Sequence, residues 1–247
     1  ETAKSALSAA QTINPGDPTV PYYLGLAHVR LGENEAAIES FKETVAFQAD
    51  TGQLLENHVS SLFNVALLYQ VTSQWDSSVA WYEKYLDRRP DDTQAITSLS
   101  IAHLGRGVQY FNAGDDVHAV EAFNSALELN PFYRDALMNL AQCYLRIARP
   151  GGEQDPATLS EEVLAERAAA AEEMLNTAKR LVDLDPLNRS SLRRLAAAYQ
   201  INGHRDSLTA VAQHMEGLPF EVSVQAFRPA AEGFQLSGVV TNLSAET

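Results

Sequence analysis

Six histidines and one cysteine are the side chains in this sequence best suited to bind a metal or act as a nucleophile. No two histidines have the four-residue spacing of a helical metal site, and none has the glutamate that completes a zinc-protease motif. With a single cysteine, Cys143, the chain offers neither an intrachain disulfide nor a thiolate-rich metal site. The sequence therefore predicts no metal site and no cofactor.

The other candidates for chemistry have structural explanations. Gly105 and Gly107 have no preceding strand and no phosphate-binding lysine, so a nucleotide-binding loop is not indicated. Asp91-Asp92 and Asp115-Asp116 begin predicted helices, where carboxylates favour the helix dipole, and they lack the repeated oxygen ligands of a calcium loop. Cys143 lies in a helical pattern where a buried, inert thiol is typical. We therefore expect no catalytic residues and predict that the chain is not an enzyme.

Composition and charge narrow the classes of partner. The chain is 45% hydrophobic and 20% charged, which is typical of folded proteins. Its formal net charge of −14 disfavours binding to nucleic acids and to anionic membrane surfaces. No apolar run is long enough to span a bilayer, so direct membrane insertion is not expected. A protein or peptide partner remains.

The elements that would position a binding site are marked by proline spacing. Five prolines each follow an apolar, helix-like stretch, and they are Pro15, Pro90, Pro131, Pro186 and Pro219. One step of 34 residues from the first of them reaches Ala49, and the following gaps are 41, 41, 55 and 33 residues. The excesses over 34 are 7 and 21 residues, close to whole numbers of helical turns, so helices can lengthen without rotating their apolar faces.

Within each period, a small residue and an aromatic or histidine three positions later share one face of the first helix. These pairs are Gly25 with His28, Ala66 with Tyr69, Gly107 with Tyr110, Ala141 with Tyr144, and Ala196 with Tyr199. The second helices carry large aromatic residues such as Phe41, Tyr82 and Phe123. Glycine in the turns at Gly32, Gly114 and Gly203 supplies the left-handed helix stop.

From Ala3 to about Gly217, this phased pattern resembles the tetratricopeptide repeat family. The resemblance implies an all-α, right-handed solenoid of helical hairpins. Residues 1–17 form the second helix of an incomplete repeat, and residues 18–217 form about five repeats. Insertions are expected near residues 50–58, 91–99 and 149–160. The last insertion ends in capping-box spacing between Thr158 and Glu161, before a long helix from about Ser160 to Leu184.

Both ends of the sequence depart from a finished solenoid. Because no first helix or polar cap precedes residues 1–17, we expect further repeats upstream or another chain that covers this end. Residues 218–247 alternate apolar and polar side chains, which predicts strands. They resemble the opening strands of immunoglobulin-like sandwich domains found behind repeats in bacterial surface proteins. We expect a truncated β-sandwich domain there, and the alternative is a β-hairpin that docks on the last helices.

In the family that the chain resembles, the first helices line a concave groove that contacts extended or helical peptides. The residues at the corresponding positions here are Tyr22, Leu26, Phe63, Asn64, Leu67, Gln70, Leu104, Val108, Phe111, Met138, Asn139, Gln142, Arg146, Arg193, Arg194 and Gln200. The first half is apolar, so we predict a groove that binds an apolar segment at one end and an acidic group at its arginines. The alternative is a solvated helix face whose arginines offset neighbouring acids. The lysine and asparagine pattern of a chaperone-tail clamp is matched only at Asn139 and Arg194, so that function is disfavoured.

The function predicted from these features is a non-enzymatic protein-protein interaction module. One alternative is a structural subunit that self-associates or joins neighbours through its repeat ends and strand edges. Another is a regulatory domain fused to an enzyme. The β-strand pattern favours a bacterial periplasmic, cell-surface or secreted protein.

Overall fold

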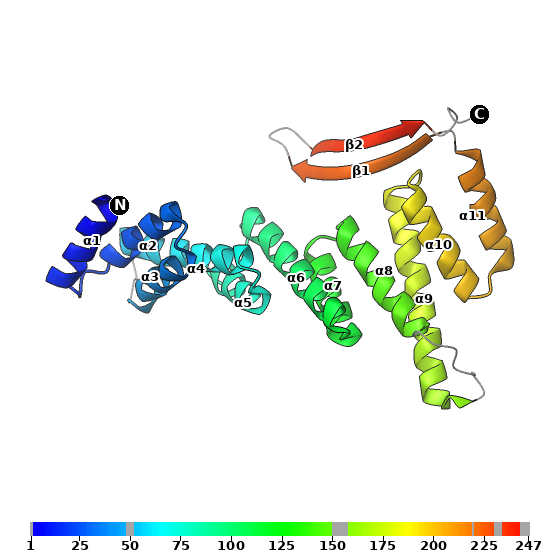
Figure 1. Ribbon diagram of the computed structural model, residues 1–247, viewed down its shortest axis with the longest axis horizontal. Helices are drawn as coiled ribbons and strands as arrows, with labels where there is room; N and C mark the ends of the chain where they lie inside the picture. Colours follow the sequence, from blue (N-terminus) through cyan, green and yellow to red (C-terminus); the bar gives the residue numbers. More distant parts are fainter. Residues whose placement is uncertain (1, 48–51, 150–157, 219, 230–233, 243–247) are drawn as a thin grey trace. The chain divides into compact units, whose positions relative to one another are not determined.

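The computed structural model describes five stretches of the chain (Figure 1), which are residues 2–47, 52–149, 158–218, 220–229 and 234–242. The chain divides into two compact units, each described by itself below. Unit 1 comprises Glu1–Arg106 and Glu128–Asn130, and unit 2 comprises Gly107–Leu127 and Pro131–Thr247.

Eleven α-helices and two strands occur in the described residues. The first helices of the repeats are α2 (Val20–Leu31), α4 (Gly52–Val71), α6 (Thr93–Ala113), α8 (Arg134–Ala148) and α10 (Arg189–Ile201). The second helices are α1 (Thr2–Ile13), α3 (Asn34–Ala46), α5 (Trp75–Leu86), α7 (Asp116–Leu129), α9 (Glu161–Leu184) and α11 (Arg205–Gly217). The predicted all-α solenoid of helical hairpins is confirmed for this part of the chain.

Left-handed residues end the first helices of four repeats. Gly32, Gly114 and Gly203 have φ angles of 75°, 83° and 71°, which glycine adopts without steric cost. They stand in the turns where the sequence predicts a helix stop, and that prediction is confirmed. Ser73 takes the same role between α4 and α5 with a φ of 57°, and no glycine announces this turn.

Extra residues of the longer repeats lie in long helices, and most of the predicted insertion near residues 149–160 falls outside the described residues. Helices α4 and α6 have 20 and 21 residues, whereas α2 has 12, and α9 has 24. The predicted cap of α9 is wrong by two residues. Ser160 is the N-cap, and its hydroxyl accepts a hydrogen bond of 3.3 Å from the backbone N–H of Val163. Since Ser160 directly precedes the first helical turn, its side chain reaches the exposed backbone donors, and the cap position therefore does not fall at Thr158.

Small residues on the first helices allow close packing against rings on the second helices. A Cβ atom added to Gly25 in unit 1 would lie 2.7 Å from the ring of Phe41. One added to Gly107 in unit 2 would lie 2.5 Å from the ring of Phe123. Both rings are fully buried, so each helix pair is held by a ring seated against backbone. The predicted role of these small residues in close helix approach agrees with this geometry.

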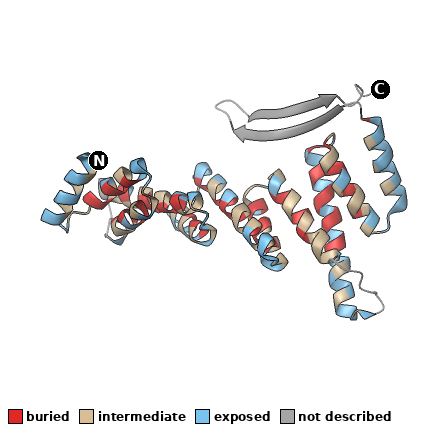
Figure 2. Cartoon of the chain, in the orientation of Figure 1, coloured by how far each residue is buried: buried red, intermediate tan, exposed pale blue. Residues whose placement is uncertain are grey.

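Burial is concentrated in the middle of the helical array and is low in two helices. Figure 2 shows red, buried segments in most helices, whereas α1 and α11 contain no buried residue. Each of these two helices therefore presents side chains that no neighbouring helix covers.

The strands β1 (Phe220–Pro229) and β2 (Phe234–Asn242) form a two-stranded antiparallel sheet. The register runs from Phe220 opposite Asn242 to Pro229 opposite Phe234, with a shift between Val224 and Ala226. A shift of this kind is typical of a β-bulge. An immunoglobulin-like sandwich requires more strands than these, and it stays a prediction.

Candidate protein-interaction surfaces

The predicted apolar half of the groove lies in unit 1, and several of its residues also serve the core. Tyr22 and Leu26 are half-buried against the core cluster that contains Phe41 and Val65. Phe63 packs with its ring edge-on to those of Tyr82 and Tyr85, at centroid distances of 5.6 and 5.3 Å. Substituting Phe63 would therefore damage the core as well as any partner contact.

Most exposed large apolar side chains in unit 1 stand on the first helices α2, α4 and α6, and Ile13 stands on α1. Leu67 and Val71 on α4 are 38% and 65% exposed, and Val29 on α2 is 41% exposed. Leu26 and Val29 are three residues apart and Leu67 and Val71 are four apart, so each pair shares one helix face. Helices α2 and α4 contact one another. We call Leu26, Val29, Leu67 and Val71 the first-helix face.

The predicted site did not include Val29 and Val71. Both continue the helical spacing from a predicted residue, and that spacing is the signal that could have identified them. The polar members of the predicted set in unit 1 are half-buried. Gln70 has a buried Oε1 atom without a hydrogen-bond partner among the described residues.

The predicted arginines lie in unit 2, and Arg146 is bound internally. Its Nε atom donates to both carboxylate oxygens of Asp116, at 2.8 and 2.7 Å. Its Nη2 atom donates to Asp116 as well, and to the carbonyl oxygen of Phe111 at 2.9 Å. Its guanidinium lies 3.8 Å from the ring centroid of Phe111. Hydrogen bonding to Asp116 raises the pKa of Arg146. A bidentate pair with a partner's carboxylate would have to displace Asp116.

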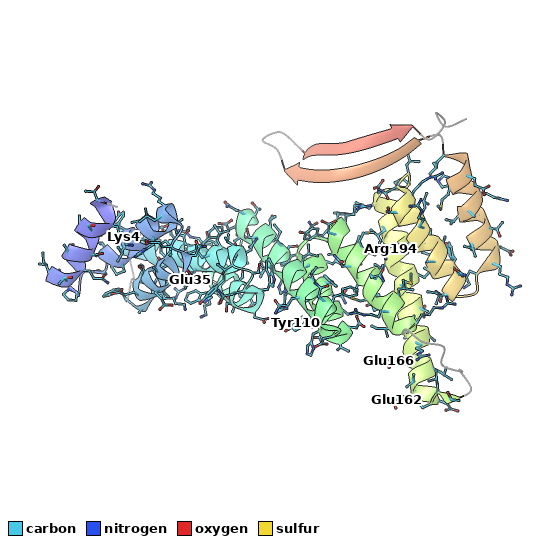
Figure 3. The ribbon with its side chains drawn as sticks, viewed as in Figure 1. Lys4, Glu35, Tyr110, Glu162, Glu166 and Arg194 are labelled. Carbon is cyan, nitrogen blue, oxygen red and sulfur yellow. The ribbon has the colours of Figure 1, made fainter. Side chains whose placement is uncertain are left out.

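Arg194, labelled in Figure 3, has a different environment. Its Nη1 atom donates to the Oε1 atom of Gln142 at 2.8 Å, which joins two predicted residues from α10 and α8. Burial, followed by the positive charge of Arg134, lowers the pKa of Arg194. Arg134 itself lies 3.7 Å from Asp185, measured from Nε to Oδ2. Arg134 thus lies near a buried carboxylate, and its positive charge acts on Arg194.

Arg134 was not predicted, because it stands at the first position of α8, outside the groove spacing. The remaining predicted residues of unit 2 are not joined into one cluster by hydrogen bonds. Asn139 donates to the carbonyl oxygen of Asp135 in its own helix at 2.8 Å. Val108 and Met138 are half-buried, and Arg193 is exposed. Arg193 lines a cavity between α10 and α11.

Cys143 and His103 lie in buried surroundings, and the pKa of each is shifted by that burial. Burial, and then the nearby Asp116, raise the pKa of the Cys143 thiol to about 12. Burial lowers the pKa of His103 to about 4, and its Nδ1 atom lies 3.1 Å from Arg106 Nη2. In the described part of the chain, no three metal-ligating side chains gather at one point. No helix in that part has both the length and the apolarity needed to cross a membrane.

Paired helices that stack small residues against rings define a helical-repeat protein of the solenoid class. The sequence profile of the tetratricopeptide repeat matches residues 24–93 and 110–151. The profile covers these two segments, less than half of the chain, so the tetratricopeptide repeat inferred from the spacing is supported there and stays a prediction for the other residues.

Two known proteins have sequences similar to this chain over part of their own length. The chain is 22% identical over 228 residues to YpiA of Bacillus subtilis, a protein described as containing this repeat. The aligned region covers 87% of this chain and 51% of YpiA. A segment of 36 residues, 15% of the chain, is 58% identical to the uncharacterized protein MJ0572 of Methanocaldococcus jannaschii and covers 42% of it. The chain therefore spans about half the length of these relatives or less.

A solved structure illustrates the shared fold. It is a tetratricopeptide repeat protein from Bacteroides fragilis, with a TM-score of 0.53, 16% identity, and coverage of 82% of this chain and 90% of that one. At this level of identity the likeness concerns the fold alone.

Proposed function

We propose that this chain is a non-enzymatic interaction module that binds an apolar protein segment on the first-helix face of unit 1. The fold supports an interaction role, because repeat solenoids present extended surfaces for partners. The observation that carries the proposal is the distribution of exposed apolar residues. In the described residues of unit 1, exposed large apolar side chains stand on α2, α4 and α6, α3 and α5 carry none, and α1 carries only Ile13.

The finer part of the proposal concerns unit 2. Arg194 and Arg134 provide a positive site for a carboxylate of the partner, with Gln142 as a hydrogen-bonding neighbour. The other predicted contacts from Tyr22 to Gln200 remain part of this proposal, except Arg146, whose guanidinium already holds Asp116.

The test uses peptides selected for binding to the intact chain from a random display library, followed by fluorescence anisotropy. We expect selected peptides to be rich in apolar residues and to lose at least tenfold in affinity for Leu67→Glu, because a charge on the face cannot be buried without a partner. Ile13→Glu is the matched control, since Ile13 is 84% exposed on α1 and lies outside the first-helix face. Selection of no binders, or equal binding to both variants, would contradict the proposal.

A second candidate function is a structural subunit of a larger assembly. The two-stranded sheet leaves one edge of β1 and one edge of β2 without a partner strand in the described residues, and such edges promote association. A complete β-sandwich formed by residues beyond these strands would cover them. Light scattering separates the two functions, because a structural subunit should gain mass as its concentration rises.

A further inference from the structure

The cavity between α10 and α11 has a volume of about 430 Å³. Pockets that hold ligands typically have about 300–1,000 Å³. Alanines from both helices, including Ala196 and Ala212, form much of its wall, and Leu208 and Met215 complete the apolar part. Its charged lining residues are Arg189, Arg193 and Glu216. The cavity is thus apolar inside and carries two arginines.

The cavity arises at a position where three of the other repeats carry a ring, whereas α9 of the remaining repeat contains no aromatic residue. Nine residues after the left-handed turn residue, three second helices place a fully buried aromatic side chain against the first helix. These pairs are Gly32 with Phe41, Ser73 with Tyr82, and Gly114 with Phe123. Nine residues after Gly203, the last described repeat has Ala212 instead. The phase of the repeat is kept, and the ring is missing.

The first helix shows the consequence of the missing ring. Gly25, Ala66 and Gly107 are the small residues that face the three rings, sixteen residues before them, and all three are buried. Ala196 stands sixteen residues before Ala212, and it is only half-buried. The space that a ring would fill is therefore open at this repeat, and small side chains surround it.

The arginines at the cavity form no ion pair within the described residues, although the carboxylate of Glu216 also lines the cavity. Arg193 is exposed, and neither an ion pair nor a hydrogen bond engages its side chain there. Arg189 donates from Nη2 to the carbonyl oxygen of Met215 at 2.8 Å, whereas its buried Nε atom has no hydrogen-bond partner. In a chain of net charge −14, two such arginines make a local site for a carboxylate.

We propose that this cavity, the α10–α11 socket, binds a partner segment that inserts one aromatic side chain and places a carboxylate beside Arg193. The aromatic side chain occupies the volume that Phe41, Tyr82 and Phe123 fill in the other repeats. The carboxylate pairs with the arginine that has no internal anion. This site goes beyond the first-helix face of unit 1, and neither proposal depends on the other.

The probe is a labelled, acetylated helical peptide rich in alanine and glutamine, with one phenylalanine and two glutamates one turn away. Binding to the full chain is measured by fluorescence anisotropy at low and high salt. We expect saturable binding that weakens at least tenfold when the phenylalanine is replaced by alanine or both glutamates by glutamine. Added salt should weaken it as well, because the ion pair lies at the surface.

The protein variants test the two parts of the socket separately. Ala212→Phe should restore the ring of the other repeats, so we expect a higher melting temperature and at least a tenfold loss of peptide binding. Arg193→Glu should cause a loss of similar size by repelling the carboxylate. The controls are Ala210→Phe and Arg205→Glu, which change exposed residues of α11 that do not line the cavity. Both controls should bind the probe as the unchanged chain does.

Three results would overturn the proposal. The first is the absence of saturable binding by the unchanged chain, and the second is equal binding by Ala212→Phe. The third is concentration-dependent dimerisation that Ala212→Phe abolishes, because a second copy of the chain would then occupy the socket. A failure here leaves the Leu67→Glu test in unit 1 unaffected, so the two proposals fail separately.

Discussion

Gly107→Ala should destabilise the protein although alanine favours a helix more than glycine does. A Cβ atom at position 107 would lie 2.5 Å from the ring of Phe123, which is fully buried and has no room to move. Gly105→Ala, two residues earlier in α6, is the matched control. Its Cβ atom would lie 2.5 Å from the ring of Trp75, but this ring is half-buried and can swing toward solvent.

The expected changes in the free energy of unfolding follow from two opposing effects. Replacing glycine by alanine inside a helix gains about 1 kcal/mol at either position. Forcing an extra carbon into a packed core costs about 1–3 kcal/mol, and this cost applies in full only where the ring cannot move. Gly107→Ala should therefore lose about 0–2 kcal/mol, whereas Gly105→Ala should gain about 1 kcal/mol because its ring can move aside. The difference between the variants is about 1–3 kcal/mol.

The assay is urea denaturation followed by circular dichroism, with hydrogen exchange in α7 as the local measurement. Repeat proteins can unfold in steps, so the denaturation midpoints are compared directly. Phe123→Leu should relieve the overlap, and the double variant with Gly107→Ala should then be more stable than the sum of the two single effects predicts. Equal midpoints for Gly107→Ala and Gly105→Ala would refute the reasoning, because the rigid ring would then carry no cost.

Two further predictions concern charge. Burial lowers the pKa of His103 to about 4 in the folded chain, below the unfolded value of about 6.5, so its contribution to stability is present above pH 6.5 and lost as the pH falls toward 4. The loss amounts to about 3 kcal/mol, and urea midpoints measured from pH 7 to 4.5 should fall less steeply for His103→Gln. Asp116→Asn should cost about 1–3 kcal/mol, because it weakens charged hydrogen bonds from Arg146. Asp76→Asn should cost less than about 0.5 kcal/mol, since that carboxylate is 69% exposed and 3.9 Å from Arg106, and equal losses in thermal melts would contradict this ranking.

Spacing predicts the helices well because each turn has a local cause. Gly32, Gly114 and Gly203 end their helices in the left-handed conformation, which glycine favours strongly and which a sequence displays openly. Ser73 adopts the same conformation because the packing of α4 on α5 requires a turn there, and that requirement is not local. The cap of α9 shows a similar limit, since both Thr158 and Ser160 are good caps and only the helix start selects between them.

The candidate site was less predictable than the fold, since partners distant in sequence decide which side chains are available. Phe63 has groove spacing, yet the rings of Tyr82 and Tyr85 use one side of it for packing. Val71 was missed although its exposure makes it a stronger candidate. Position on a first helix indicates which face a residue occupies. Its exposure depends on how far the second helices extend over that face.

The predicted arginines differ in how well they can serve an acidic partner. An arginine pairs bidentately only when its fork is available, and the fork of Arg146 already holds the carboxylate of Asp116. Arg194 instead donates to the neutral amide oxygen of Gln142, and a carboxylate is a stronger acceptor that could replace it without leaving an internal anion unpaired. The nearby positive charge of Arg134 disfavours the charged state of Arg194, and a bound carboxylate would relieve that repulsion. The acidic contact in unit 2 should therefore depend on Arg194 and Arg134 and be insensitive to Arg146.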